Sequence, residues 1–266
     1  MSEHALADRF DAFVVDLDGV VYLGERAVPR SPETIRELRA RGKRLLFLTN
    51  DPRSSRARYA HRLAGIGVPA DESEILTSGA ATAQFLTERA GLRGAPVYVV
   101  GSPAFKAEME RAGLRLVDGH GDAPSAVVVG GHERFDYDEL KTAALAVRAG
   151  AELYAAGRDA TFPTPEGPLP ATGAILAAIE TAAGRRAQVV GKPEPFVFEI
   201  ARARLEPAAR VAVVGDNLDS DVAGGRRAGL TTILVLTGIA TESEAASAPV
   251  APDYVVDDLG ALLEPL

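Results

Sequence analysis

The chain has no cysteine and only four histidines among its 266 residues. The absence of cysteine excludes disulfides, thiol chemistry and zinc sites built on thiolates. The histidines show no metal-ligand spacing. Positive charge is also in short supply, because 29 lysines and arginines face 37 acidic residues and give a formal net charge of −8. This balance argues against nonspecific binding to nucleic acid or to an anionic membrane as the main role.

Long hydrophobic runs are missing as well. The longest uncharged apolar runs fall far short of the roughly 20 residues that a membrane-spanning helix needs, and the first nine residues do not form a charged-then-apolar leader. Apolar residues make up 47% and charged residues 25% of the chain, which is typical of a globular protein. We therefore expect a soluble, cytoplasmic protein with no membrane partner.

The most informative segment is Asp16-Leu17-Asp18-Gly19, which directly follows the apolar residues 13–15. Residues 13–15, Phe-Val-Val, are typical of a short buried strand. Two acids two residues apart lie on the same side of a strand if its pairing continues, and a cation between them relieves their repulsion. The segment therefore predicts a divalent metal site at the end of a strand.

Three further apolar runs also end in polar residues. Residues 45–48 precede Thr49 and Asn50, residues 189–190 precede Lys192, and residues 211–214 precede Asp216 and Asp221. In an open parallel sheet, ligands bind beyond the carboxyl ends of the strands. Carboxylates, a hydroxyl, an amide and an ammonium group suit a phosphate ester together with Mg²⁺.

These four segments, in this order, resemble the signature motifs of the haloacid dehalogenase (HAD) superfamily of phosphatases. The resemblance covers nearly the whole chain, and the stretch between the second and third motifs resembles subfamily IIA. Members of that subfamily, NagD-like and p-nitrophenyl-phosphatase-like proteins, carry a large α/β cap of the C2 type. The resemblance implies a Rossmann-like parallel-sheet core with an inserted α/β cap domain.

The alternation of strand-like and helix-like segments independently favours an α/β protein with a mainly parallel sheet. The simplest division is a catalytic core at 1–79 and 189–266 with a cap at 80–188. A helix is expected to begin with Ser31 as its N-cap and Pro32 at its first position. The proline- and glycine-rich residues 161–170 are expected to form a loop.

The resemblance assigns roles to the acidic residues. Asp16 is the expected nucleophile, which forms an aspartyl-phosphate, and Asp18 the expected general acid and base. The expected Mg²⁺ ligands are Asp16, the main-chain carbonyl of Asp18, Asp216 and Asp221, the last directly or through water. Dehalogenases of the family lack an acid at the position of Asp18, because a halide needs no protonation, so this chain is expected to act on phosphate.

The remaining expected site residues bind the phosphoryl group or the rest of the substrate. Thr49 and Asn50 are expected to donate hydrogen bonds to phosphoryl oxygens, and Lys192 to offset the negative charge. In the cap, His132 stands where similar caps commonly carry Asp, and Asp159 lies in a segment whose usual Thr-Asn is replaced by Ala156 and Gly157. His132 and Asp159 are candidates for substrate specificity, with a solvent-exposed turn as the equal alternative for His132.

The resulting hypothesis is a Mg²⁺-dependent phosphatase for small soluble phosphate monoesters, such as sugar phosphates, glycerol phosphates or nucleoside monophosphates. A phosphotransferase or mutase that uses the same intermediate is one alternative. A non-catalytic regulatory protein that carries a phosphorylated aspartate is another, although the acid at position 18 argues against it. Caps of this type often mediate dimerisation in relatives, so a homodimer is also an expectation.

Overall fold

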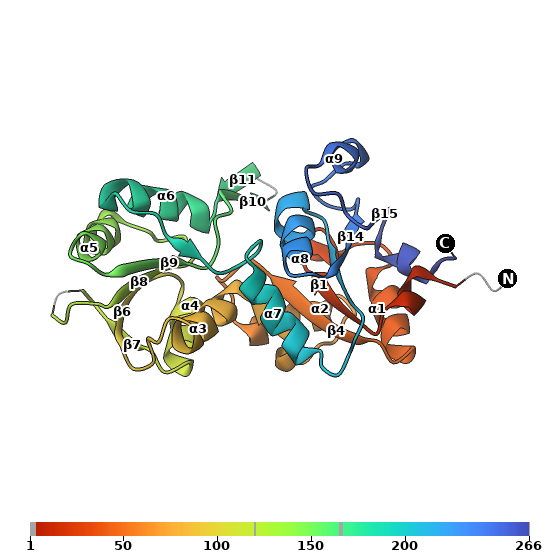
Figure 1. The fold of residues 1–266 in the computed structure, drawn as a ribbon, viewed down its shortest axis with the longest axis horizontal. Helices are drawn as coiled ribbons and strands as arrows, with labels where there is room; N and C mark the ends of the chain where they lie inside the picture. Colours follow the sequence, from red (N-terminus) through yellow and green to blue (C-terminus); the bar gives the residue numbers. More distant parts are fainter. Residues whose placement is uncertain (1–3, 120, 165–166, 266) are drawn as a thin grey trace. The chain divides into compact units, whose positions relative to one another are not determined.

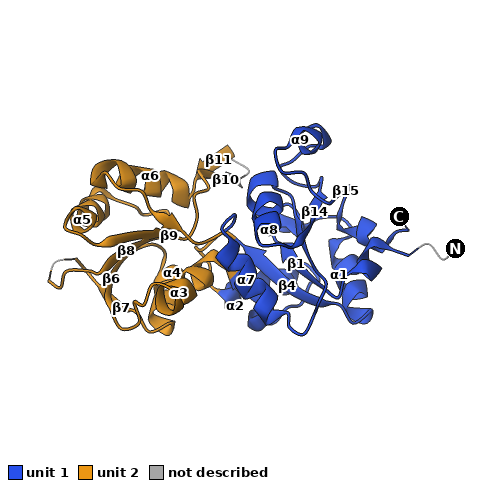
Figure 2. Ribbon diagram, in the orientation of Figure 1, with its two compact units in different colours: residues 1–49, 56–76, 192–266 blue, residues 50–55, 77–191 orange. Residues whose placement is uncertain are grey.

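The computed structural model describes residues 4–119, 121–164 and 167–265. The chain divides into two compact units (Figure 2). Unit 1 comprises residues 1–49, 56–76 and 192–266, and unit 2 comprises residues 50–55 and 77–191. The short segment 50–55, which directly follows a strand of unit 1, is thus part of unit 2. The boundaries expected for a core and a cap, at 79/80 and 188/189, stay a prediction.

Unit 1 contains a six-stranded sheet in the order β15-β14-β13-β1-β4-β5 (Figure 1). Its strands are β1 Ala12–Asp16, β4 Arg44–Thr49, β5 Ile75–Thr77, β13 Val211–Gly215, β14 Thr231–Val235 and β15 Tyr254–Val256, with a small ribbon of β2 Tyr22–Leu23 and β3 Arg26–Ala27. Its α-helices are α1 Ser31–Ala40, α2 Arg56–Gly65, α7 Pro195–Arg204, α8 Gly224–Arg227 and α9 Glu242–Ser247. The short helices are η1 Leu6–Arg9, η2 Glu72–Glu74, η4 Leu259–Leu263 and the π-helical η3 Leu218–Ala223.

Unit 2 contains a five-stranded sheet in the order β12-β9-β8-β6-β7. Its strands are β6 Pro96–Val100, β7 Arg115–Val117, β8 Ala126–Val129, β9 Glu152–Ala155 and β12 Gln188–Val189, with a separate ribbon of β10 Thr161–Thr164 and β11 Gly167–Pro170. Its helices are α3 Ser78–Glu88, α4 Pro103–Arg111, α5 Tyr137–Arg148 and α6 Thr172–Ala183. All pairings within the five-stranded sheet are parallel. The α/β class and the parallel-sheet architecture expected from the sequence are confirmed.

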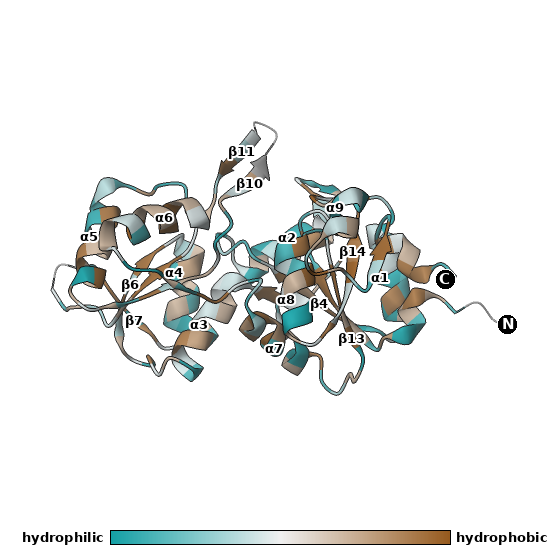
Figure 3. Ribbon diagram, turned by 45° about the horizontal axis from the view of Figure 1, so that its top comes forward, coloured by the Kyte–Doolittle hydropathy of each residue, from teal (hydrophilic) through white to brown (hydrophobic). Residues whose placement is uncertain are grey.

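Strand β1 is central because it is apolar on both faces. All five of its residues are buried, and it pairs in parallel with β13 on one side and β4 on the other. Strands covered on both faces are continuous hydrophobic runs rather than alternating ones. The hydropathy colouring shows the same contrast between apolar strands and amphipathic helices (Figure 3).

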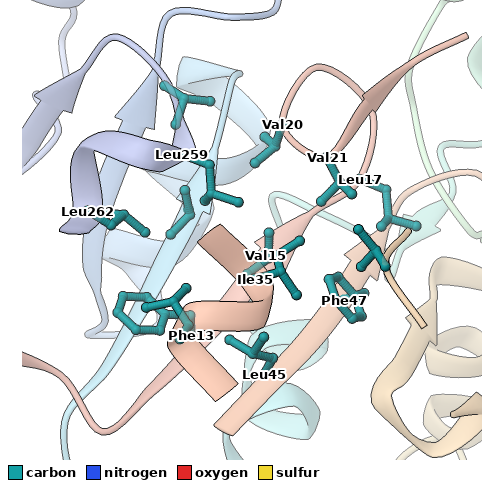
Figure 4. Packing of buried hydrophobic residues seen from close by; sticks show 14 of the residues in the cluster. Phe13, Val15, Leu17, Val20, Val21, Ile35, Leu45, Phe47, Leu259 and Leu262 are labelled. Atoms are coloured by element: carbon teal, nitrogen blue, oxygen red, sulfur yellow. The ribbon is translucent and has the colours of Figure 1, made fainter. Parts of the chain in front are cut away.

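The core of unit 1 is built around this strand. Phe13, Val15 and Leu17 are fully buried and belong to one cluster with Phe47 of β4 and Ile35 of α1 (Figure 4). Phe13 also contacts Phe10 edge-on, with 5.7 Å between ring centroids. The chain thus buries the residues on either side of Asp16 and fixes where its carboxylate leaves the sheet.

Two local expectations are wrong. Ser31 is the first residue of α1 rather than its N-cap, which is Arg30 with φ of 69°. The Ser31 hydroxyl instead donates to the carbonyl of Val21 at 2.8 Å. A tertiary partner for the hydroxyl therefore outweighs local capping.

The segment 161–170 is also not simply a loop, because it contains the antiparallel ribbon β10–β11. Residues 165–166 lie outside the described residues. Proline removes a donor from a sheet ladder and is tolerated mainly at edges. In this ribbon Pro163 faces Pro168 and Thr161 faces Pro170, so prolines are accommodated in a two-stranded ribbon with two edges.

We expect Phe13→Ala to lower the free energy of unfolding by about 3–5 kcal/mol, because it leaves a cavity in a core that is fully buried. Urea unfolding followed by circular dichroism measures this loss. Val250→Ala, at a position that is 38% exposed in the same unit, is the control and should change stability by less than about 0.5 kcal/mol. Equal effects of the two substitutions would contradict the packing described here.

Candidate active site

The site of unit 1 lies at the carboxyl ends of its central strands. Asp16 is the last residue of β1, Thr49 is the last residue of β4, and Asp216 directly follows β13. Asp16 pairs in register with Leu48, and Val15 pairs with Val214. The chain proceeds from β1 to β4 on one side and places β13 on the other, so this is the topological switch point at which open α/β sheets bind ligands.

Lys192 connects two of the carboxylates. Its Nζ lies 2.6 Å from Asp16 Oδ1 and 2.7 Å from Asp221 Oδ1. The side chains of Lys192, Asp16 and Asp221 are only 3%, 11% and 2% exposed. Buried charges of this kind are stable only when each has partners, because desolvation is costly. The short segment before α7 therefore delivers the ammonium group on which the site depends.

Three carboxylates form a group that could hold a metal ion. Asp16, Asp216 and Asp221 each offer an oxygen, these oxygens lie within 4.8 Å of one another, and all three residues are buried. One ammonium group against three carboxylates leaves excess negative charge. Carboxylate oxygens are the ligands of hard divalent cations, so the residues present fit such an ion in donor type and in charge.

The electrostatics of the cluster reflect this excess. Burial raises the pKa of Asp16 well above its usual range, and Asp221 and Asp216 raise it further, while Lys192 acts in the opposite direction. Burial alone would lower the pKa of Lys192, but the attraction of Asp16 and Asp221 outweighs it, so the pKa of the lysine is raised and the group stays charged. The ammonium group is thus a permanent positive charge beside Asp16.

Two glycines make room for the Asp216 carboxylate, and one of them, Gly238, was not identified from the sequence. A Cβ at Gly19, where φ is 79°, would lie 2.2 Å from Asp216 Oδ2, and a Cβ at Gly238 would lie 1.8 Å from the same oxygen. The amide of Ile239 donates to this oxygen at 2.9 Å, and Thr237 Oγ1 donates to the carbonyl of Gly19. The sequence did contain a pattern that could have identified Gly238. Thr237 and Gly238 follow the apolar strand β14, just as the other polar segments of the site follow apolar strands.

Asp221 is placed by the turn that follows β13. Asn217 caps the π-helical turn, since its Oδ1 accepts from the amides of Asp219 and Ser220 at 2.9 and 3.0 Å. A Cβ at Gly215 would lie 2.3 Å from Asp221 Cβ, so only glycine allows this approach. Asn217 therefore provides the cap, while Asp221 Oδ2 accepts from the amide of Asn217 at 3.3 Å and Oδ1 accepts from Lys192.

Asp18 lies outside the carboxylate group of Asp16, Asp216 and Asp221. The pairing of β1 ends at Asp16, and Asp18 is exposed. The buried hydroxyl of Tyr22 donates to Asp18 Oδ2 at 3.4 Å. Burial and the nearby Asp18 raise the pKa of Tyr22, so its hydroxyl stays protonated and remains a donor.

The two polar residues after β4 belong to different units. Thr49 is buried at the end of the strand in unit 1. Asn50 is counted with unit 2, where its Nδ2 donates to Asp159 Oδ2 at 2.9 Å and its carbonyl accepts from Ser78 Oγ at 2.7 Å. The structure therefore brings together Asn50 and Asp159, which the sequence analysis assigned to separate tasks.

His132 follows β8 in unit 2. Its Nε2 lies 2.9 Å from Glu139 Oε2 without the alignment of a hydrogen bond. Its ring packs edge-on against Phe135, with 6.2 Å between the ring centroids. The side chain is 12% exposed, so the alternative of a solvent-exposed turn is wrong, and a role in specificity stays a prediction.

Comparison with known proteins gives a consistent result. Residues 13–115 match the family described as haloacid dehalogenase-like hydrolase, and residues 189–262 match a HAD-hydrolase-like family. The chain is 39% identical to chronophin from Rattus norvegicus, over 94% of this chain and 86% of that protein. It is 38% identical to glycerol-3-phosphate phosphatase from Homo sapiens, over 98% of this chain and 92% of that protein.

A solved structure shows the same architecture. Glycerol phosphate phosphatase from Mycobacterium tuberculosis, in complex with magnesium, superimposes with a TM-score of 0.93 at 36% identity, covering 98% of this chain and 78% of that one. The chain therefore belongs to the haloacid dehalogenase superfamily. Within it, the chain is a HAD-type phosphatase of subfamily IIA, as its motifs predicted.

We expect Asp216→Asn to stabilise the metal-free protein at pH 8. Burial, followed by repulsion from Asp221, raises the pKa of Asp216 to about 6 from 3.8. The folded protein therefore holds a proton on Asp216 more tightly than the unfolded chain does. Ionised Asp216 thus lowers the free energy of unfolding above pH 6, and this loss of stability disappears as the pH falls towards 4. Each pKa unit corresponds to about 1.4 kcal/mol, so the gain at pH 8 is about 3 kcal/mol.

Urea unfolding of both proteins in EDTA, at pH 8 and at pH 4.5, measures this gain. Asp257→Asn, at an exposed position in the same unit, is the matched control and should leave stability unchanged. A stability gain of Asp216→Asn that is equal at both pH values would contradict the electrostatic explanation.

Proposed function

We propose that this phosphatase hydrolyses small phosphate monoesters with the help of Mg²⁺ and through an aspartyl-phosphate on Asp16. The observation that carries the proposal is the buried group of Asp16, Asp216 and Asp221 around Lys192 at the ends of the central strands. It combines a candidate nucleophile, a set of oxygen ligands and a fixed positive charge.

Asp16, Asp216 and Asp221, together with the main-chain carbonyl of Asp18, are the residues that would hold Mg²⁺. When bound, the ion neutralises negative charge on the phosphoryl group and on Asp16. Mg²⁺ usually takes one or two carboxylates and keeps several waters, so Asp221 can act through water while it pairs with Lys192.

The covalent steps belong to Asp16 and Asp18. An Asp16 oxygen attacks phosphorus and the bond from phosphorus to the ester oxygen breaks, while Asp18 gives its proton to the departing alkoxide. Asp18, now a carboxylate, takes a proton from water, and the resulting hydroxide attacks phosphorus and releases phosphate from Asp16. Nucleophilic catalysis of this kind divides one difficult step into two easier ones.

The other residues hold the phosphoryl group. Lys192 is charged throughout and offsets the charge that builds up beside Asp16. The hydroxyl of Thr49, at the end of β4, and the amide of Asn50 are proposed donors to the phosphoryl oxygens.

For the substrate, we propose a glycerol phosphate as the first candidate. Two of the similar proteins reported above are named for this activity.

Unit 2 is proposed to act as the cap, with His132 among the residues that select the leaving group. A homodimer is proposed on the same family grounds, as is the division into a core at 1–79 and 189–266 and a cap at 80–188. Within the described residues no helix is long and apolar enough to cross a membrane.

We expect phosphate release from glycerol phosphate, sugar phosphates, nucleoside monophosphates or 4-nitrophenyl phosphate to require both Mg²⁺ and Asp16. EDTA should abolish release, and Asp16→Asn should lower kcat by at least about 10³-fold, because the nucleophile is lost. A colorimetric phosphate assay across this panel gives the order of substrates. Turnover by Asp16→Asn at the wild-type rate would contradict the proposal.

The alternatives give different products. A phosphotransferase would consume the ester in the presence of an acceptor alcohol and release less phosphate than alcohol. A regulatory phospho-acceptor would keep its phosphorylated aspartate for minutes and release almost none. Equal amounts of alcohol and phosphate support the hydrolase.

We expect Asp18→Asn to affect substrates according to their leaving groups. The variant should lower kcat/KM for glycerol phosphate by about 10²–10⁴-fold, because an alkoxide needs a proton as it departs. The loss for 4-nitrophenyl phosphate should be at least about tenfold smaller, because nitrophenolate is a weak base. Asp219→Asn, at an exposed acid beside the same site, is the control. Equal losses for both esters would contradict the role of Asp18 as general acid.

A further inference from the structure

Asn50 is held in one orientation by contacts within unit 2. Its Nδ2 donates to Asp159 Oδ2 at 2.9 Å, which distinguishes the amide nitrogen from the amide oxygen. On the other side, a Cβ at Gly191 would lie 2.8 Å from Asn50 Oδ1 and 2.1 Å from the carbonyl of Ala156. The amide therefore lies between a carboxylate and a glycine that has no room for a side chain. A reversed amide would turn its oxygen towards the Asp159 carboxylate.

The main chain of Asn50 is fixed as well. Its carbonyl accepts from the buried Ser78 hydroxyl at 2.7 Å. Three residues further on, the carbonyl of Arg53 accepts from Ser102 Oγ at 2.9 Å, and the Arg53 guanidinium lies 3.7 Å from the Phe162 ring centroid. The segment 50–55 is thus anchored to unit 2 at several points, although Asn50 is bonded directly to Thr49 of unit 1.

Asp159 is itself held by the start of α6. The amide of Gly173 donates to the carbonyl of Asp159 at 2.8 Å. A Cβ at Gly173 would lie 2.3 Å from the carbonyl of Arg158, so the two chain segments are in direct contact. The exposed carboxylate of Asp159 therefore extends from a backbone that has little freedom.

An ion pair with the buried carboxylate of Glu180 holds the side chain of Arg158, which directly precedes Asp159. Arg158 donates to both oxygens of Glu180, at 2.8 and 2.9 Å, and Glu180 also accepts from Arg186 and from the amide of Ala187. The Glu180 side chain is 5% exposed. Bidentate pairs between arginine and a carboxylate add geometric precision as well as energy. The loop that carries Asp159 is thus anchored at both its backbone and its adjacent side chain.

We propose that Asp159 is a positioning residue that orients the Asn50 amide as a hydrogen-bond donor for the phosphoryl group, rather than a residue that selects the leaving group. The proposal rests on the proposed function, because it needs a phosphoryl group at Asn50. The Asp159 carboxylate accepts a hydrogen bond from Nδ2 of Asn50 and so fixes the positions of the amide nitrogen and the amide oxygen. It acts through Asn50 and makes no contact with substrate of its own.

The first test is a double-mutant cycle of Asn50→Ala and Asp159→Ala. Steady-state kcat and KM for the best ester of the panel, and the Kd of inorganic phosphate with Mg²⁺ by calorimetry, are measured for each protein. Asp159→Ala should lower kcat/KM and weaken phosphate binding by about tenfold each, within the range of a charge-assisted hydrogen bond. In the Asn50→Ala background it should have less than about a twofold effect. Independent, multiplicative losses would overturn the proposal.

Matched variants separate positioning from folding. Asp159→Asn keeps an acceptor and should retain activity within about threefold. Glu152→Ala breaks the exposed ion pair with Arg185 at the opposite end of β9 and should change nothing. Thermal midpoints of all variants are recorded. A loss in Asp159→Asn as large as that in Asp159→Ala would overturn the proposal.

The exchanged pair Asn50→Asp with Asp159→Asn remains informative even if Asp159→Ala does not fold. It restores a hydrogen bond between the two positions but leaves a carboxylate at position 50. The thermal midpoint should return towards wild type while phosphate binding stays at least about tenfold weaker. Recovery of phosphate binding together with stability would show a purely structural bond and overturn the proposal.

Failure of the proposed function gives a different pattern. A wild-type protein that binds phosphate but hydrolyses no ester contradicts the proposed function, and the inference about Asp159 is then decided by the phosphate Kd values alone. A wild-type protein that does not bind phosphate contradicts both. Wild-type turnover with multiplicative losses in the cycle contradicts only the inference.

Discussion

The ion pairs of Lys192 with Asp16 and Asp221 are the interaction on which the site depends. They place a permanent positive charge at 2.6–2.7 Å from two carboxylates that are almost completely buried. Removal of one partner would leave an uncompensated buried charge, which costs several kcal/mol. The remaining negative charge of the cluster then provides a physical reason for a divalent cation. Stability and catalysis therefore place opposing demands on the same acidic residues.

The positions of these acidic residues are fixed by the buried strands that carry them and by glycines that leave space for their carboxylates. Gly19 and Gly238 both leave space beside Oδ2 of the Asp216 carboxylate, and Gly215 leaves space for Asp221. Since the strands below are fully buried and paired on both sides, the carboxylates cannot relax away from one another without loss of core packing. A preorganised, electrostatically strained cluster is the expected state of a site that binds a metal and a phosphate.

The sequence predicted the α/β class, the parallel sheets and the family because apolar runs ending in polar residues are a local pattern. It could not predict the contact between Asn50 and Asp159, which are 109 residues apart in the chain. It also missed Gly238 and Ile239, whose roles depend on which strand lies beside β13. Ser31 and the ribbon at 161–170 were assigned wrongly, because tertiary hydrogen bonds and strand pairing outweighed local capping and turn signals. Local chemistry was therefore predictable, whereas long-range partners were not.

The central claim, that Asp16 is the nucleophile, is tested most directly by rapid-quench single turnover with a phosphate ester labelled in its phosphoryl group. Acid-quenched protein is digested, and the labelled peptide is identified by mass spectrometry. The account predicts a transient phosphoryl group on Asp16 that appears before free phosphate and is absent from Asp16→Asn. Release of labelled phosphate with no label on Asp16 at any time, or a label on another residue, would contradict it.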